Sequence, residues 1–203
     1  MPKLSPKVME EKKESILKAA FLVFSKKGYS AASMNDIVLA SGVSKGGIYN
    51  YFESKEAIFL EIAERRFIKR GKLVKTLDDC ETLTAFMEGY ISEVLDSLNE
   101  PESIMTARFS YEFWSVVTRD EHLREMAQKR YDDFFQLIDI RVQRAVLKGE
   151  IEAFKDYESM GFVLIATLEG LIFTNTIMGI RMTTASKRLY LNLILEMFFG
   201  KGI

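Results

Sequence analysis

The residues that could build an active site are few in this chain of 203 residues. It contains one histidine, His122, and one cysteine, Cys80, which excludes most histidine-based catalysis, an internal disulfide framework and a cysteine-based zinc site. Glu121 and Glu125 flank His122 at a spacing that could hold a metal, but such a group is more often a solvated helix surface. The sequence has no glycine-rich phosphate loop that follows a strand, because it shows no strand pattern. We therefore expect no catalytic residue, no metal, no cofactor and no enzymatic activity.

A different chemistry is carried by residues 37–52, which read IVLASGVSKGGIYNYF. Gly42 suits the left-handed backbone at a helix end, and Ser44 has the position of an N-cap for a second short helix. Two short helices joined by such a turn form a helix-turn-helix. The exposed start of the second helix, the part that reads bases and phosphates in a major groove, would consist of Ser44, Lys45, Gly46 and Gly47.

The elements that must position this motif are helices, and we predict an all-α fold. Capping residues, terminal glycines and apolar residues at helical spacing mark the helix boundaries. The expected helices cover residues 6–27, 33–40, 44–51, a long segment from 55, 83–98, 103–117, 122–147, 157–178 and 186–199. Around the motif, we expect the first helix to receive the inward-facing side chains of Ile37, Val38, Ala40 and Ile48.

Charge is unevenly distributed along the chain. Residues 1–52 contain eight lysines and four acidic residues, a charge of +4, whereas the whole chain carries −1 and the remainder therefore −5. This asymmetry suggests that a small basic unit and a larger acidic helical body do different jobs. Together with the helix-turn-helix, it leads us to expect a DNA-binding domain of residues 1–53 and a larger domain of residues 54–203. Chance segregation of solvated faces would give the same charges, so charge alone does not decide between the two interpretations.

The most apolar stretch, from Met160 to Ile180, is interrupted by Glu169, which leaves uncharged runs of 9 and 11 residues. A membrane span requires about 20 apolar residues, so we expect a buried helix and no membrane partner. Residues 1–15 are rich in Lys and Glu and do not resemble a signal peptide. These features favour a cytoplasmic protein.

The segment from Ile16 to Leu60 resembles the TetR family of bacterial transcriptional regulators. The resemblance is strongest over GVSKGGIYNYFESKE, which begins at Gly42, and it includes the spacing of Gly28, Ser33, Ile37, Tyr49 and Lys55. It implies an N-terminal three-helix domain with a helix-turn-helix, followed by a larger helical domain for ligand binding and dimerisation. The expected partners are a double-stranded DNA operator, a second copy of the chain and a small-molecule effector.

The resemblance also implies roles for individual residues. Ser33 and Met34 would lie against a DNA phosphate, and Lys55 would contact another at the start of its helix. Phosphates would also be reached by Tyr49 and Asn50, although Tyr49 could instead be a packing residue. Gly47 departs from the family pattern, which often has Thr, Ser or Ala there, so more of the readout would fall to Lys45, backbone amides and DNA shape.

The C-terminal helices are expected to form a homodimer interface. Between Leu189 and Phe199 the sequence is apolar almost all round the helix, which requires burial on several sides. A monomer core could provide that burial, but a terminal helix has little chain left to cover it. The expected interface residues are Leu164, Leu168, Leu171, Leu189, Leu193 and Met197.

Aromatic and methionine side chains of the larger domain could line a ligand pocket, although such a stripe is more often plain core. The candidates are Phe86, Tyr90, Met105, Phe109, Phe113, Trp114, Phe134, Arg141 and Thr167. We therefore expect a ligand-responsive homodimeric repressor that binds a palindromic operator. The alternative is an all-α ligand carrier or structural protein that does not bind DNA.

Overall fold

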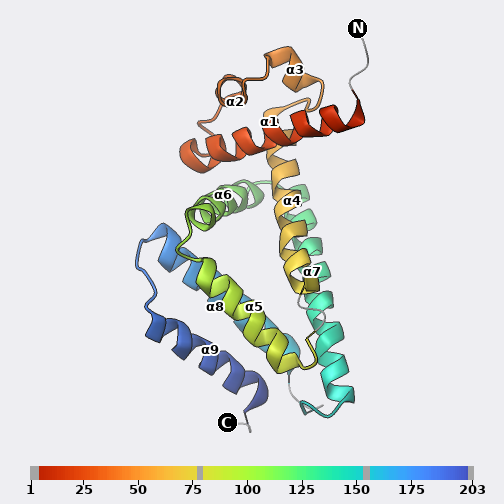
Figure 1. Cartoon of the computed structure of the whole chain (residues 1–203), viewed down its shortest axis with the longest axis vertical. Coiled ribbons are helices and arrows are strands. Elements are labelled where there is room, and N and C mark those ends of the chain that lie inside the picture. The colour runs from red at the N-terminus through yellow and green to blue at the C-terminus, as the bar shows by residue number, and fades with distance from the viewer. Residues whose placement is uncertain (1–4, 77–79, 153–155, 201–203) are drawn as a thin grey trace. The chain divides into compact units, whose positions relative to one another are not determined.

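The computed structural model describes residues 5–76, 80–152 and 156–200, and all regular structure in these ranges is helical, which confirms the all-α prediction (Figure 1). The elements in chain order are α1 (Pro6–Lys27), α2 (Met34–Ser41), α3 (Lys45–Tyr49), α4 (Lys55–Thr76), α5 (Leu83–Ser97), α6 (Pro101–Val117), α7 (Glu121–Leu147), α8 (Tyr157–Ile172), a π-helix η1 (Phe173–Ile177) and α9 (Thr184–Phe199).

The helix ends follow the local chemistry that the sequence predicts. The Ser5 hydroxyl caps α1, and Ser33 caps α2 through a reciprocal capping box with Asp36. Ser44 accepts a hydrogen bond from the Gly47 amide at the start of α3. Gly42 ends α2 in the left-handed conformation, with φ of 67°, where a residue with a side chain would be strained.

One expected helix is interrupted. The chain from Tyr157 continues beyond α8 as the π-helix η1, in which Asn175 is buried. The Asn175 amide nitrogen donates to the carbonyl of Leu98 at 3.1 Å, and its oxygen accepts from the Met182 amide at 2.8 Å. A π-turn changes the direction in which a side chain leaves the helix, so it places this amide between two other segments.

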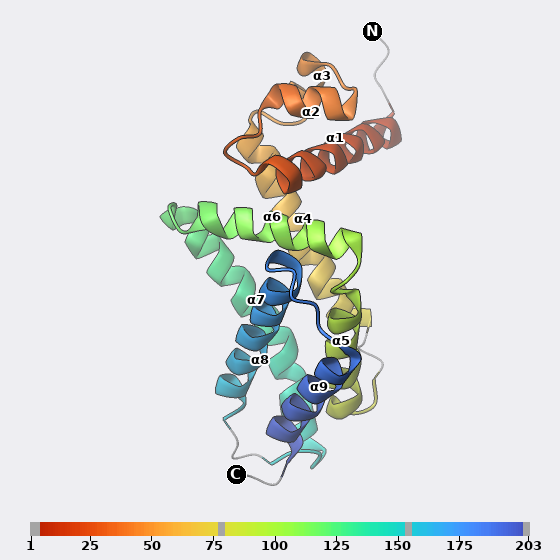
Figure 2. The ribbon, with the colours of Figure 1, turned by 90° about the vertical axis from the view of Figure 1, so that its left-hand side faces the viewer.

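The chain forms two compact units, and the first contains the described residues up to Ile68 together with Arg108–Arg119. It therefore extends past the expected boundary at residue 53 and includes half of α4 and part of α6. Both views place α2 and α3 on the same side of α1 (Figure 2). The core combines fully buried aliphatic residues with an aromatic cluster in which Phe59 lies 5.2 Å from Phe24 and 4.9 Å from Phe109 between ring centroids.

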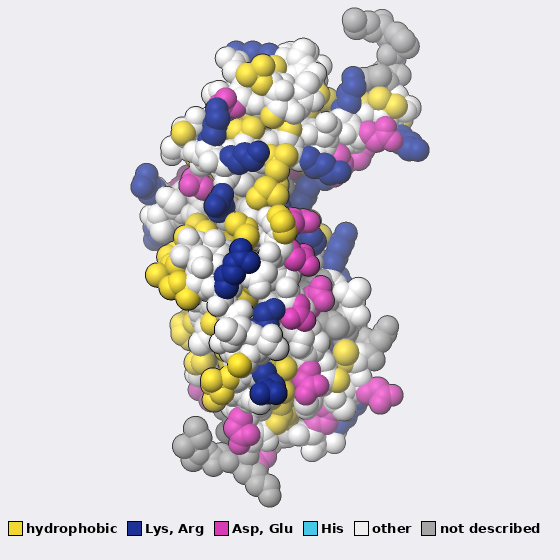
Figure 3. Space-filling view, turned by 60° about the vertical axis from the view of Figure 1, so that its left-hand side comes forward, with side chains coloured by type: hydrophobic (Ala, Val, Ile, Leu, Met, Phe, Trp, Pro, Cys, Tyr) yellow, Lys and Arg dark blue, Asp and Glu magenta, His cyan; other side chains and the backbone are white. Residues whose placement is uncertain are grey.

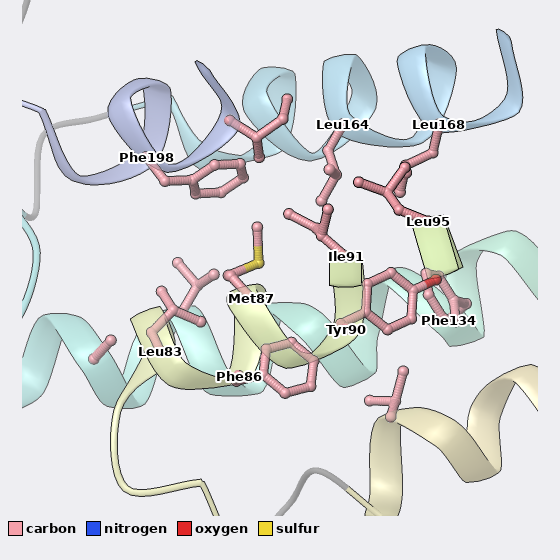
Figure 4. Packing of buried hydrophobic residues seen from close by; sticks show 14 of the residues in the cluster. Leu83, Phe86, Met87, Tyr90, Ile91, Leu95, Phe134, Leu164, Leu168 and Phe198 are labelled. Atoms are coloured by element: carbon pink, nitrogen blue, oxygen red, sulfur yellow. The ribbon is translucent and has the colours of Figure 1, made fainter. Parts of the chain in front are cut away.

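The second unit contains Lys69–Ala107 and the described part of residues 120–203. Its core lies around α5 (Figure 4). Met87, Ile91 and Leu95 point towards Leu164 and Leu168 of α8, and Phe198 of α9 points towards the same layer. Phe86 and Tyr90 lie on another face of α5.

Among the described residues, one segment is long and apolar enough to cross a membrane, namely Tyr157–Ile177, and 22% of its most apolar window is buried within the chain. Length and composition are the only support for a span, and Glu169 lies in this segment. A helix covered by a partner passes the same test.

The capping box of α2 determines how the Asp36 carboxylate titrates at low pH. The Lys27 ammonium, 2.5 Å from the Asp36 carboxylate, and the Ser33 amide and hydroxyl lower the pKa of Asp36 from 3.8 to about 2. A carboxylate with a depressed pKa stabilises the fold above its ordinary pKa, and this contribution is lost as the pH falls through the folded value.

We therefore expect the Asp36 carboxyl carbon to titrate near pH 2 in an NMR experiment on the native protein. Lys27→Met should move the titration upward, because it removes the largest cause of the shift. Lys26→Met, an exposed lysine next to it, is the control and should leave the titration in place. An unchanged Asp36 titration in Lys27→Met would contradict the assignment.

Candidate nucleic-acid interface

The helix-turn-helix is held together by buried aliphatic side chains from both helices. Ile37 of α2 and Ile48 of α3 are fully buried, and Val43 of the intervening turn is half-buried. Val38 is half-buried, but Ala40 is exposed, so the expectation that it faces inward was wrong. Ala40 lies in the last turn of α2, where it lines a groove that runs along α1.

Gly47 has a packing role in this chain. A Cβ atom at this position would lie 2.9 Å from the Val43 side chain and 3.1 Å from the Ser44 hydroxyl. Gly47 therefore lets α3 approach the turn that precedes it, at the cost of a side chain that could reach a base.

Helix α3 and its two capping residues present polar groups to the surface. Ser44, Lys45, Gly46 and Asn50 are exposed, and Tyr49 is 46% exposed. The Lys45 ammonium has no hydrogen-bond or ion-pair partner among the described residues. Tyr51 is half-buried and Phe52 is buried, so they anchor α3. An ammonium, a phenol, an amide and free backbone groups on a short helix are the groups that a major groove accepts.

The start of α2 differs from the simple phosphate contact that was expected. The Ser33 hydroxyl and amide both donate to Asp36, at 2.8 and 2.9 Å, and Met34 is half-buried. The polar groups of Ser33 are thus engaged in the capping box, which leaves the first backbone amides of α2 as the donors of this helix end.

Lys55 is also engaged. Its ammonium donates to the carbonyl oxygens of Tyr29 at 2.7 Å and Ala32 at 2.8 Å, and it lies 4.3 Å from the centroid of the Tyr29 ring. Burial, and secondarily the charge of Glu56, raises the pKa of Tyr29. The sequence could not show these contacts, because the carbonyl groups of a loop carry no signature in residue type.

Glu112 of α6 belongs to the same site and was missed by the sequence analysis. Its carboxylate accepts a hydrogen bond from the Tyr29 amide at 2.8 Å, across 83 residues of chain. A Cβ atom at Gly28, which has φ of +79°, would lie 3.0 Å from this carboxylate. No spacing rule links Glu112 to a helix-turn-helix so distant in sequence.

A groove of about 910 Å³ runs along α1 and reaches Ala40 of α2. Its lining includes Glu10, Glu11 and Glu14, with Lys7 and Lys18. Three carboxylates make this groove unfavourable for a phosphate backbone, so the surface that α3 presents is the better candidate for a nucleic-acid contact.

The candidate ligand residues fall into two groups. Arg141 stacks on Phe86 at 4.1 Å, while Tyr90 lies 6.2 Å from both Phe86 and Phe134, so these four side chains adjoin one another in the second unit. Met105 belongs to that unit and is half-buried.

The other three aromatic candidates belong to the aromatic cluster of the first unit, and they are Phe109, Phe113 and Trp114. Thr167 is exposed on α8 and hydrogen-bonds the Tyr190 hydroxyl at 2.8 Å. The predicted ligand residues thus belong to both units, and within the second unit Arg141, Phe86, Tyr90 and Phe134 adjoin one another.

The candidate dimer residues also divide. Leu164 and Leu168 are each 4% exposed and pack against α5 within one chain, because the interior face of an apolar helix is the one its own core covers. Leu171 and Met197 are half-buried. Leu189 and Leu193 are 61% and 60% exposed.

Further large apolar side chains are exposed on α8, in η1 and just after η1, namely Phe162, Val163, Phe173, Ile177, Met178 and Ile180. Figure 3 shows hydrophobic side chains gathered on the surface that α8, η1 and α9 form. Among the described residues, no group of three His, Cys, Asp or Glu side chains could hold a metal ion.

Comparison with known proteins agrees with this geometry. The family model "Bacterial regulatory proteins, tetR family" matches residues 16–62. The uncharacterised HTH-type transcriptional regulator YfiR of Bacillus subtilis is 27% identical over 95% of this chain and 98% of its own. The repressor DhaR of Mycobacterium sp. (strain GP1) is 32% identical over 52% of this chain and 55% of its own.

Solved structures share the fold over nearly the whole chain. Salmonella enterica GusR superposes with a TM-score of 0.78 at 21% identity and covers 98% of this chain and 99% of its own. Bacillus subtilis FadR, solved with stearoyl-CoA, has a TM-score of 0.70 at 18% identity and covers 93% and 99%.

A further relative decides the family. The HTH-type transcriptional regulator YvdT of Bacillus subtilis is 30% identical over 72% of this chain and 73% of its own length. The chain belongs to the TetR family of bacterial transcriptional regulators.

Proposed function

We propose that this regulator is a cytoplasmic homodimeric repressor, which binds a palindromic operator through α3 and is released by a small molecule bound in the second unit. The observation that carries the DNA half of the proposal is the exposed first turn of α3, fixed on a buried core and bearing the unpartnered Lys45. A repressor among the relatives supports the sign of regulation.

In this proposal the readout of bases and the neutralisation of phosphates fall to different residues. Ser44, Lys45, Gly46 and Gly47 approach the base edges and the adjoining backbone, where Lys45 supplies a charge and a donor. The phenol of Tyr49 and the amide of Asn50 donate to phosphates. At the start of α2, which Ser33 caps, the backbone amide of Met34 donates to a phosphate.

The dimer half rests on exposed apolar surface. Eight large apolar side chains on α8, η1 and α9 and in the segment just after η1 are between 39% and 69% exposed, among them Phe162, Met178, Leu189 and Leu193. A contiguous apolar surface of this kind on a soluble regulator marks an interface. A twofold dimer presents two α3 helices to half-sites one helical turn or a multiple apart, which matches a palindromic operator.

The effector half rests on Arg141. Arg141 is 9% exposed in a unit whose core is otherwise mainly apolar, and its guanidinium lies over the Phe86 ring and donates to the Val74 carbonyl at 3.4 Å. A charge of this kind suits a ligand with an apolar body and an anionic group. FadR, solved with stearoyl-CoA, is a structural relative whose ligand has that chemistry. Ligand binding would release the operator by favouring a conformation with lower DNA affinity.

We expect Lys45→Ala and Tyr49→Ala each to weaken operator binding by roughly 10- to 100-fold, because each removes a contact worth about 1–3 kcal/mol. The measurement is fluorescence anisotropy with the DNA upstream of the protein's own gene and with scrambled DNA, at several salt concentrations. Lys12→Ala removes the same charge from the exposed face of α1 and serves as control. Wild-type affinity in both α3 variants would refute the proposal that α3 faces the DNA.

We expect Leu193→Glu to shift the protein towards monomer, because it places a charge in the proposed interface. Sedimentation velocity over a range of protein concentrations measures the effect. Leu147→Glu makes the same change at a leucine that is 88% exposed at the end of α7 and should leave the oligomeric state unaltered. An identical sedimentation profile for both variants would place the dimer contact elsewhere.

For the effector, we expect stearoyl-CoA, titrated into the operator complex, to release the DNA. Arg141→Met keeps the apolar stem and should raise the concentration needed for half-release by roughly tenfold or more, since a charge-assisted hydrogen bond contributes about 1.5–3 kcal/mol. Anisotropy of the labelled operator follows the release. Equal sensitivity of the wild type and the variant would exclude Arg141 from the ligand site.

A further inference from the structure

The loop between α1 and α2 is held by side chains of opposite charge. It consists of Gly28 to Ala32 and has few backbone hydrogen bonds of its own, namely Gly28 to Phe24 and Ala32 to Gly28. On one side, Lys55 binds the carbonyls of Tyr29 and Ala32. On another, Glu112 binds the amide of Tyr29. Both polar groups of the Tyr29 backbone are therefore satisfied by charged side chains.

The Lys55 ammonium is poorly placed to donate to DNA. An ammonium has three N–H bonds, and two of them are used for carbonyls at 2.7 and 2.8 Å. The group also lies over the ring of Tyr29. A phosphate would have to compete with all three interactions, and Lys55 is half-buried. Lys45, in contrast, is exposed on α3.

Glu112 can approach the loop closely because Gly28 has no side chain. A Cβ atom at Gly28 would stand 3.0–3.2 Å from the carboxylate, so glycine at this position admits the close approach. Tyr29 is fixed from a third side by its ring, which lies 4.5 Å from the ring of Phe59. The next residues along the chain are Ala32 and the Ser33 cap, so the position of this loop sets the start of α2.

We infer that Lys55 and Glu112 are positioning residues for DNA binding, which together clamp the Gly28–Ala32 loop and thereby fix the start of α2, and that Lys55 does not itself bind a phosphate. The inference rests on the proposed function, because it concerns how the same DNA-binding surface is held.

Two simpler interpretations make different predictions. If Lys55 binds a phosphate, its removal lowers both the affinity and the salt dependence of binding, by about 0.9 in the slope of log K against log salt for each phosphate. If Glu112 is only a negative charge near DNA, its removal strengthens binding. The clamp predicts that removal of Lys55 and removal of Glu112 each weaken DNA binding. It also predicts that removal of Lys55 leaves the salt slope nearly unchanged.

The first experiment compares salt slopes for Lys55→Met and Lys45→Met on DNA that the wild-type protein selects from a random pool. We expect both variants to lose roughly tenfold or more in affinity, since each loses charge-assisted contacts. The slope should fall by about 1 per protomer for Lys45→Met and by less than half of that for Lys55→Met. Equal slope losses would overturn the assignment of Lys55.

The second experiment compares Glu112→Ala with Glu112→Gln. The amide oxygen of Gln can accept the same hydrogen bond, so Glu112→Gln should bind DNA within about threefold of wild type. Glu112→Ala should bind several-fold more weakly. Glu53→Ala removes the same charge from an exposed side chain between α3 and α4 and should bind slightly more tightly. Tighter binding by Glu112→Ala would overturn the positioning role.

A measurement without DNA separates failure of the clamp from failure of the proposed function. Hydrogen exchange of the Tyr29 amide, followed by NMR, should accelerate in Glu112→Ala and remain slow in Glu112→Gln. Slow exchange in both would overturn the clamp even if DNA binding is confirmed. If the wild type selects no DNA although the exchange behaves as expected, the proposed function fails and the positioning role falls with it, while the loop contact itself stands.

Discussion

A helix of five residues cannot maintain its own conformation in water, because helix nucleation is unfavourable and so short a helix gains few hydrogen bonds. The DNA-facing surface that we propose is carried by such a helix, α3 (Lys45–Tyr49). Its conformation depends on Ile48, which is fully buried, and on Phe52, which is 5% exposed. The hydrogen bond from Gly47 to Ser44 and the close approach that Gly47 permits complete the anchor. Polar groups can therefore face outward without being needed to stabilise the helix that carries them.

The basic N-terminal region shows that the number of charges and their availability are different properties. The Lys13 ammonium pairs with Glu61 at 2.9 Å, and Lys27 pairs with Asp36 at 2.5 Å. Lys55 is bound to loop carbonyls. These lysines contribute to the long-range potential that attracts DNA, but their short-range contacts are made within the protein. Lys45 is exposed on α3, so in the proposed DNA complex a contact that depends on one ammonium falls to Lys45.

Local features of the fold could be predicted from the sequence because they depend on neighbouring residues. The caps at Ser5, Ser33 and Ser44 and the left-handed Gly42 are all of this kind. The hydrogen bond of Glu112 joins residues 83 positions apart, and the π-turn at Phe173 depends on where Asn175 finds its partners. Periodicity showed that α8 is apolar, but not which side its own core covers. For this reason Leu164 and Leu168 were assigned to the partner-facing surface, although they pack inside the chain.

Asn175 fixes the conformation of η1, the segment that carries part of the exposed apolar surface. An amide that is 5% exposed must find partners for its donors and its acceptor, and Asn175 does so with Leu98, Asn99 and the Met182 amide. These bonds tie η1 to the end of α5 and to the segment before α9. Phe173, Ile177 and Met178 project from the tied segment and are 39–58% exposed. Because a buried polar group is costly to leave unsatisfied, the segment cannot fold these side chains inward without breaking the Asn175 contacts. In the proposed homodimer, the second copy of the chain buries them.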